Sequence, residues 1–158
     1  MILDVGCGTN YVGDVNCDLY VDDIGHRSGR RDVSVDRINV KAVPNFVLCD
    51  ALHLPFKDAS FPKVVCRHLI EHVSKPESLM FELLRVSQLV VEVACPNALG
   101  EHRSDFHMNH FRSRWFWNFG KRYCNYVFVY TSQWRCFPSD LFCLFRLPSE
   151  ISARFVKR

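Results

Sequence analysis

The chain has 158 residues, of which 48% are hydrophobic, and a formal net charge of +3, so its length allows one globular domain with a buried core. No apolar run approaches the roughly 18 residues of a membrane-spanning helix, and no charged leader precedes the first apolar segment. We therefore expect a soluble, cytoplasmic protein that does not use a membrane.

The eight cysteines include no Cys-x-x-Cys pair, which argues against a structural zinc site. Five of them lie in or beside short apolar segments: Cys7, Cys17, Cys49, Cys66 and Cys95. A small thiol packs well in such a segment, so we expect free buried cysteines. Internal disulfides are the alternative for a protein of thermophilic origin.

Short apolar segments alternate with polar ones along the first hundred residues. We expect strands at residues 1–5, 15–19, 46–48, 64–66 and 89–94, and a helix at residues 75–85 with Ser74 as its N-cap and Pro76 in its first turn. This alternation predicts a parallel sheet. Only about ten residues separate Gly8 from Asp18, where dinucleotide-binding folds leave room for a helix, so the first crossover helix is missing or very short.

The remaining segments are less regular. Residues 22–45 are polar and rich in Arg and Asp, which predicts a loop or an irregular helix. Residues 111–119 are expected to form a helix, and residues 126–130 and 151–156 a closing antiparallel pair of strands.

Charged and aromatic residues divide the chain into two unequal parts. Residues 1–100 hold 10 Lys and Arg against 13 Asp and Glu, whereas residues 101–158 hold 10 against 4. Residues 101–158 also hold 15 of the 21 aromatic residues. The second part is therefore basic and aromatic, and the first part is ordinary in composition.

The first strand ends in an acid and a Gly-x-Gly turn, formed by Asp4 and by Gly6, Cys7 and Gly8. Glycines allow the sharp turn and the close approach of a ligand to the backbone. Two later strands are also followed or ended by an acid, Asp18 and Asp50. Parallel strands carry such groups to one edge of the sheet, so the pattern indicates a pocket for a nucleotide-like cofactor.

These segments, together with residues 54–61 and 64–73, resemble the class I S-adenosylmethionine (SAM)-dependent methyltransferases, in particular the type 11 family. The resemblance covers residues 1–95. It implies a Rossmann-like α/β fold with seven strands, a mostly parallel sheet, an antiparallel C-terminal strand and reduced helices at the N-terminal side. It also implies a single domain, residues 1–158, with a cofactor-binding half at residues 1–95 and a substrate-binding half at residues 96–158.

The resemblance implies SAM as cofactor and assigns the residues that bind it: Asp4, Gly6, Cys7, Gly8, Asp18, Leu19, Asp50, Ala51, Leu52, Arg67 and His68. The turn would pass under the ribose and the methionyl part, Asp4 would face the ammonium group, and Asp18 would accept the ribose hydroxyls. Asp50 and the backbone of Ala51 and Leu52 would read the adenine.

Arg67 and His68 follow the fourth strand, where the methionine tail and the substrate meet in this family. Methyl transfer mainly needs a positioned nucleophile and exclusion of water, so we name no catalytic residue. The candidates for a general base are His68, His72, His107 and His110.

Three other interpretations have less support in the sequence. Residues 68–72 read His-x-x-Glu-His, a zinc-protease pattern, but they follow a strand where that pattern needs a helix. His102, His107 and His110 lack supporting Cys or acid spacing, so we expect no metal site. An NAD-dependent oxidoreductase would need a third glycine at position 11, which is Tyr11.

The sequence therefore predicts a SAM-dependent methyltransferase with an unidentified acceptor. A small-molecule acceptor is the first expectation. RNA is the second, because Arg112, Arg114, Lys121 and Arg122 lie among aromatic residues. The alternative function is a binding or regulatory subunit that needs a partner chain. The short first crossover and the absence of an N-terminal helix from the sequence favour it, because both leave the pocket open.

Overall fold

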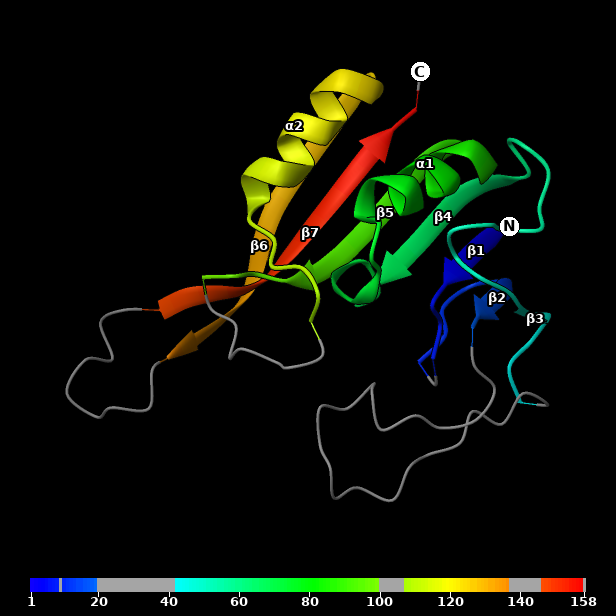
Figure 1. Cartoon of the computed structure of the whole chain (residues 1–158), viewed down its shortest axis with the longest axis horizontal. Coiled ribbons are helices and arrows are strands. Elements are labelled where there is room, and N and C mark those ends of the chain that lie inside the picture. The colour runs from blue at the N-terminus through cyan, green and yellow to red at the C-terminus, as the bar shows by residue number, and fades with distance from the viewer. Residues whose placement is uncertain (9, 20–41, 100–106, 137–145, 158) are drawn as a thin grey trace.

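Seven strands form one mixed sheet in the computed structural model, which describes residues 1–8, 10–19, 42–99, 107–136 and 146–157 (Figure 1). The strands are β1 (Ile2–Val5), β2 (Val15–Asp18), β3 (Phe46–Leu48), β4 (Phe61–Arg67), β5 (Ser87–Pro96), β6 (Tyr126–Cys136) and β7 (Arg146–Val156). Their order in the sheet is β3-β2-β1-β4-β5-β7-β6. The first five strands run parallel, and β7 is antiparallel to both β5 and β6. This is the fold that the sequence predicts.

Two α-helices and one 3-10 turn connect the later strands. They are η1 (Ile70–His72), α1 (Pro76–Val86) and α2 (Ser113–Tyr123). The expectation that Ser74 caps α1 is wrong: Lys75 occupies the N-cap position, and no side chain caps the helix there. Pro76 is the first helical residue, where its fixed φ and missing N–H suit the helix start. None of the described helices is both long and apolar enough to cross a membrane.

Helix α2 continues past the expected end at residue 119 to Tyr123, and Gly120 lets it approach β6 closely. A Cβ at Gly120 would lie 2.5 Å from the Cβ of Val127. Phe116 and Phe119 are buried beneath the helix, and Phe119 makes an edge-on contact with Phe155 of β7. The antiparallel pair of β6 and β7 is as expected, with Tyr126 opposite Val156.

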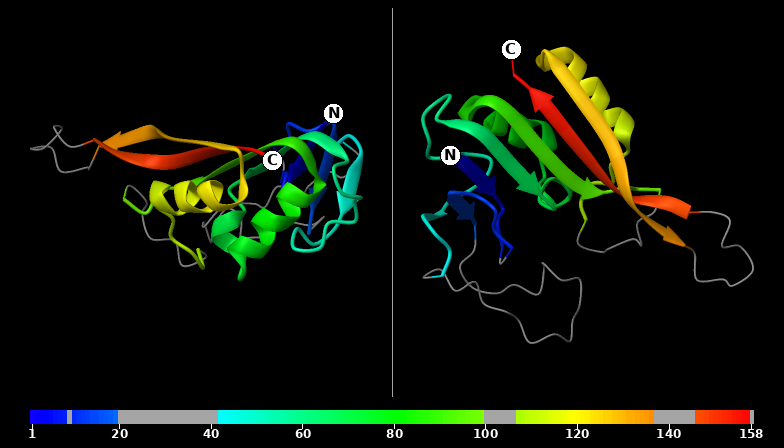
Figure 2. Two further views of the ribbon diagram at one scale, coloured as in Figure 1. Left: turned by 90° about the horizontal axis from the view of Figure 1, so that it is seen from above. Right: turned by 180° about the vertical axis from the view of Figure 1, so that it is seen from behind.

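Both helices lie on the same side of the sheet (Figure 2). The strand residues on this covered face are almost completely buried, among them Val64, Cys66, Val91, Val93 and Ile151. They form one continuous core with Leu79, Met80 and Leu83, which form the apolar stripe of α1. Burial of this stripe is what holds a helix of only 11 residues in place.

The opposite face of the sheet carries no helix among the described residues (Figure 2). It bears charged pairs instead: Lys63 Nζ lies 2.7 Å from Glu92 Oε2, and Arg154 Nε lies 3.8 Å from Glu92 Oε1. Three aromatic side chains of β6 are exposed there: Tyr126, Phe128 and Tyr130. Phe128 and Tyr130, together with residues of β4, β5 and β7, line a pocket of about 480 Å³ on this face.

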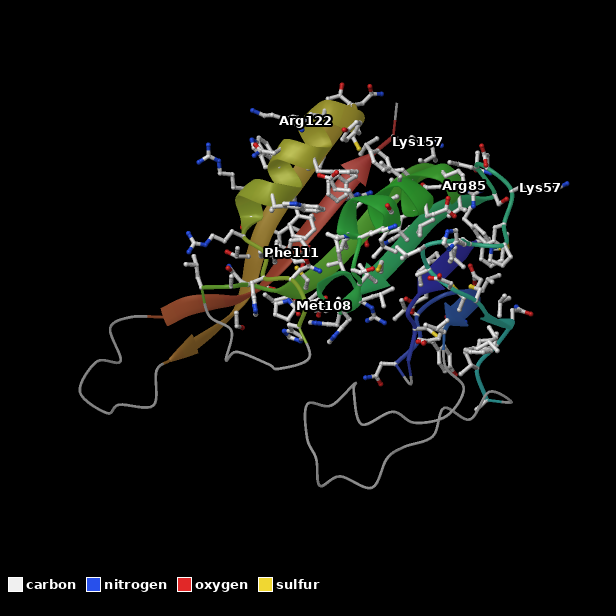
Figure 3. The ribbon with its side chains drawn as sticks, in the orientation of Figure 1. Lys57, Arg85, Met108, Phe111, Arg122 and Lys157 are labelled. Carbon is white, nitrogen blue, oxygen red and sulfur yellow. The ribbon has the colours of Figure 1, made fainter. Side chains whose placement is uncertain are left out.

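The connection between β3 and β4 contains no helix and is held to α1 by one arginine (Figure 3). Arg85 makes a two-pronged contact with Glu82, at 2.7 and 2.8 Å, and donates to the carbonyl oxygens of Leu54 and Phe56. The Leu54 N–H donates to Glu82 in return. Leu54 is buried and belongs to the core, so the connection is packed against the rest of the fold.

The first crossover, between β1 and β2, also has no helix among its described residues, as expected from its length. Asn16 holds it: the Asn16 side chain accepts a hydrogen bond from the Gly13 N–H and donates to the carbonyls of Gly13 and Pro44. Most of residues 22–45 lies outside the described residues, so the expected loop there stays a prediction. The six cysteines whose side chains are described are thiols and not disulfides, and five of them are buried.

Candidate cofactor site

The glycine turn after β1 has the left-handed backbone that the sequence suggests. Gly6 and Gly8 have φ angles of +72° and +55°. The N–H groups of Gly6 and Cys7 both donate to the Cys17 carbonyl, at 2.9 and 3.1 Å, which fixes the turn against β2. A Cβ at Gly6 would lie 2.9 Å from Cδ2 of Leu69, so a larger residue has no room.

Asp4 and Asp18 lie at the carboxyl ends of β1 and β2, beside this turn. Asp18 is 7% exposed, and its Oδ2 accepts the Gly8 N–H at 3.0 Å. Asp4 is 1% exposed, and its Oδ2 accepts the Val12 N–H at 2.9 Å. Burial raises the pKa of Asp4, although the hydrogen bond from Val12 and the charge of Arg67 oppose the shift. Asp4 therefore fixes the crossover as well as facing the site.

Asp50 follows β3, and two contacts fix its carboxylate and favour the ionised form. Its Oδ1 accepts the Leu52 N–H at 2.8 Å, and its Oδ2 lies 3.2 Å from Nδ1 of His53. These contacts lower the pKa of Asp50, the Leu52 hydrogen bond most of all. Because the Leu52 amide is already donated to Asp50, the Ala51 amide becomes the better candidate for reading a base. Leu19 is 48% exposed at the end of β2.

Arg67 ends β4 and reaches across to the first crossover. Its Nη2 lies 3.5 Å from Asp4 Oδ2 and donates to the Asn10 carbonyl. Its Nε is buried and has no hydrogen-bond partner among the described residues. A buried donor without a partner is costly, so this edge of the sheet has one positive group that a bound anion would satisfy.

The side-chain contacts of His68 lie away from this group, toward Glu71 and β7. Its backbone has φ +52°, a conformation rare for a residue with a side chain. The His68 ring contacts Glu71, with Nδ1 3.6 Å from Oε1, and Glu150 of β7, with Nε2 3.2 Å from Oε2. Glu71 is the main cause that raises the pKa of His68, against the effect of burial, and Glu150 adds to it.

The structure thus brings together the glycine turn, Asp4, Asp18 and Arg67, and places Asp50 on the next strand of the same edge. The Cys7 side chain is buried against Val43 and Phe46, so Cys7 can reach a ligand only through its backbone.

Sequence reasoning missed two residues near this edge. Asn16 was missed as a structural element, although a polar residue inside an apolar strand was the available signal. Glu71 was read only as part of a protease-like pattern, yet it is 2% exposed.

Three of the four histidines that are candidates for a general base lie close together. His72 and His107 have ring centroids 4.8 Å apart, and His107 and His110 have centroids 6.5 Å apart. Figure 3 shows Met108, the neighbour of His107 in the sequence, beside the turn that follows β4. These three histidines therefore share one region, whereas His102 lies outside the described residues.

The chain is similar to known methyltransferases in sequence and in fold. The model of a family described as a methyltransferase domain matches residues 3–88. No curated protein matches the chain. A SAM-dependent methyltransferase of Thermotoga maritima, described as a possible histamine N-methyltransferase, has a TM-score of 0.72 at 15% identity and covers 99% of this chain and 82% of its own.

Two further structures are similar. A SAM-dependent methyltransferase from Archaeoglobus fulgidus has a TM-score of 0.70 at 13% identity, over 99% of this chain and 85% of that one. Phosphoethanolamine N-methyltransferase 2 of Haemonchus contortus, in complex with SAM, has a TM-score of 0.66 at 13% identity, over 99% of this chain and 48% of that one. At these identities the likeness shows the fold.

Proposed function

Because the chain belongs to the methyltransferase-domain family, whose cofactor is S-adenosylmethionine, we propose that it binds SAM at the carboxyl ends of β1 to β4 and transfers the methyl group to an acceptor. The observation that carries the proposal is the position of three acids. Asp4, Asp18 and Asp50 end or follow three adjacent parallel strands, next to a left-handed glycine turn. The NAD-dependent alternative lacks its third glycine and carries no further support.

The groups at this edge match the parts of SAM in charge and position. Asp18 would accept hydrogen bonds from the ribose hydroxyls, and Asp50 would accept one from the adenine amino group. Asp4 would face the ammonium group of the methionyl tail. Arg67, with its buried Nε lacking a partner, would face the carboxylate of the same tail. The residues present therefore fit the cofactor.

SAM supplies a methyl group that its positive sulfur already activates. The chain then has to orient the acceptor, keep water out and, for an acceptor that carries an acidic proton, receive it. His68 stands between Glu71 and Glu150 on the side of β7, so it is the first candidate for holding such a proton. The strained backbone at His68 supports this role, because such conformations concentrate at functional positions.

We propose a small molecule as the acceptor in preference to RNA. Phe111, Phe116 and Phe119 belong to the buried core, so they cannot stack on bases. Trp117 is 42% exposed, but Lys121 Nζ already lies 5.2 Å from its ring centroid. The basic residues of α2 are thus left with few stacking partners, which weakens the pattern that suggested RNA.

Calorimetric titration of the chain with SAM and with its demethylated product tests the proposal. We expect micromolar binding that weakens about tenfold or more in Asp18→Asn, because a hydrogen bond to a charged group contributes about 1.5–3 kcal/mol. Glu77→Gln is the matched control, since Glu77 is an exposed acid on α1. Absence of binding by the folded wild-type chain, or equal affinity in Asp18→Asn, would contradict the proposed site.

A second candidate function is a methyltransferase-like subunit that is completed by a partner chain. The observation that favours it is the face of the sheet that bears no helix among the described residues, with Tyr126, Phe128 and Tyr130 exposed on it. Under this hypothesis the isolated chain binds SAM weakly or not at all. The same titration therefore separates the two functions: tight binding by the chain alone excludes the need for a partner to form the pocket.

A further inference from the structure

A buried carboxylate follows β4 and has no hydrogen-bond partner. Glu71 is 2% exposed, and neither of its oxygens accepts a hydrogen bond from the described residues. The histidine nitrogens beside it are His68 Nδ1 at 3.6 Å and His72 Nε2 at 3.9 Å, both beyond hydrogen-bond length. A buried charge is costly unless a counter-charge or a metal ion satisfies it, so Glu71 requires an explanation.

Two histidines provide the other part of a metal site. One ligand atom each from Glu71, His72 and His107 lies within 4.8 Å of the other two. The segment carrying His107 is fixed to η1, because the Asn109 N–H donates to the Glu71 carbonyl at 3.1 Å and the Asn109 side chain donates to the Val73 carbonyl at 2.7 Å. The three groups are therefore held together by the fold.

We propose that Glu71, His72 and His107 bind a divalent transition-metal ion, with Zn²⁺ as the best match. Two imidazoles and one carboxylate form a ligand set that Zn²⁺ accepts, leaving a fourth position open. Mg²⁺ and Ca²⁺ prefer oxygen ligands only, so two histidines disfavour them. Metal bonds of about 2.0–2.2 Å require ligand atoms about 3.3 Å apart, so the ligand atoms must approach one another by up to about 1.5 Å.

The sequence argued against a metal here because His-x-x-Glu-His needs a helix across both histidines. The structure has only a 3-10 turn at Ile70–His72, so His68 and His72 do not act as the protease pattern requires. The third ligand instead comes from His107, which is distant in the sequence and which no spacing rule connects to Glu71. The metal site shares no residue with the cofactor-binding acids, so its test does not depend on them.

The test is a Zn²⁺ titration of the chelator-treated chain by calorimetry, repeated with Co²⁺ and followed by absorption. We expect one equivalent of Zn²⁺ to bind, and affinity to fall at least about tenfold in Glu71→Gln and in His107→Gln. His53→Gln is the matched control, because the His53 side chain is 82% exposed and pairs with Asp50. Zn²⁺ should also raise the melting temperature of the wild type and of the control, but not of the two variants.

Several outcomes would overturn the site. They are no binding by the wild type, equal binding in all four proteins, or a Co²⁺ spectrum with a thiolate band, which would assign the metal to cysteines. Circular dichroism checks that the variants fold. Glu71→Gln removes a buried charge and keeps the shape, so the metal-free variant should be at least as stable as the metal-free wild type. If it is clearly less stable, Glu71 is serving as a structural ion-pair partner of His68, and the metal site is wrong.

Discussion

The two faces of the sheet differ more than any other two regions of the molecule. Under α1 and α2 the strand residues are apolar and fully buried, whereas the opposite face carries ion pairs and exposed aromatics. The same strands serve both faces, because successive residues of a strand point in opposite directions. The covered face therefore contributes most of the stability. The charged and exposed groups available for binding lie at the sheet edge and on the opposite face.

The largest expected effect is on the covered face. Phe116 lies on the buried side of α2, where its ring is fully buried and contacts Phe111 and Trp115. Phe116→Ala should lower the free energy of unfolding by about 3–5 kcal/mol, measured by urea denaturation, because it removes the aromatic surface and leaves a cavity. Trp117→Ala, at the next position and 42% exposed, is the control and should cost much less. Similar costs for the two would mean that α2 does not pack as described.

The second effect concerns the connection between β3 and β4, which Arg85 of α1 holds in place. Arg85→Met should lower the free energy of unfolding by about 2–3 kcal/mol, because Glu82 and the carbonyls of Leu54 and Phe56 lose their donor. Arg122→Met, an exposed change in the last turn of α2, should change it by less than about 0.5 kcal/mol. Equal effects in a denaturant titration would show that the Arg85 contacts are not formed in solution.

The third effect is a pH dependence with a defined sign. The hydrogen bond from Arg85 is the main cause that lowers the pKa of Glu82, so ionised Glu82 stabilises the folded state. This contribution is complete above the ordinary pKa of a glutamate and is lost as the pH falls through the lowered value in the folded state.

Glu82→Gln should therefore be less stable than the wild type by about 1–2 kcal/mol at pH 7, with the gap closing as the pH falls below the ordinary pKa of a glutamate. Thermal melts across this range measure it. A gap that stays constant with pH would contradict the role of the Glu82 charge, since the variant would then act through packing alone.

The smallest effect is expected on the open face. Phe128 is 57% exposed, whereas its neighbour Val127 packs against the core from the other side of the same strand. Phe128→Ala should change the free energy of unfolding by less than about 0.5 kcal/mol, and Val127→Ala should cost about 1–2 kcal/mol. Chemical denaturation of both variants at several protein concentrations compares them. A cost for Phe128→Ala that grows with concentration would show that a second copy covers this face.

The mostly parallel sheet could be predicted because apolar segments and acids alternate along the first hundred residues. The boundaries were less predictable. Ser74 was chosen as the N-cap of α1 from residue type alone, but the chain enters the helix at Pro76 after Lys75. Helix α2 ends at Tyr123 and not at residue 119, and its close approach to β6 at Gly120 and Val127 leaves no local signal in the sequence.

The candidate site shows the same limit. The glycine turn and the acids carry a local pattern, so the sequence places them on one edge of the sheet. The engagement of the Leu52 amide by Asp50, and the contact of His68 with Glu150, depend on how loops and β7 fold back. Such contacts join residues that are distant in the sequence or depend on a turn conformation. The assignments of Asp4, Gly6, Asp18, Asp50 and the other cofactor-binding residues stay predictions until binding is measured.

The position of β6 at one end of the sheet has a consequence for handling the protein. The other end is closed by β3, which has only three residues, whereas β6 extends over Tyr126–Cys136. A long terminal strand offers its backbone groups to a strand of another molecule, and natural proteins usually shorten or charge such strands. We expect β6 to be where aggregation begins at high concentration, so a Lys at position 128 should improve solubility in a light-scattering assay without harming the fold.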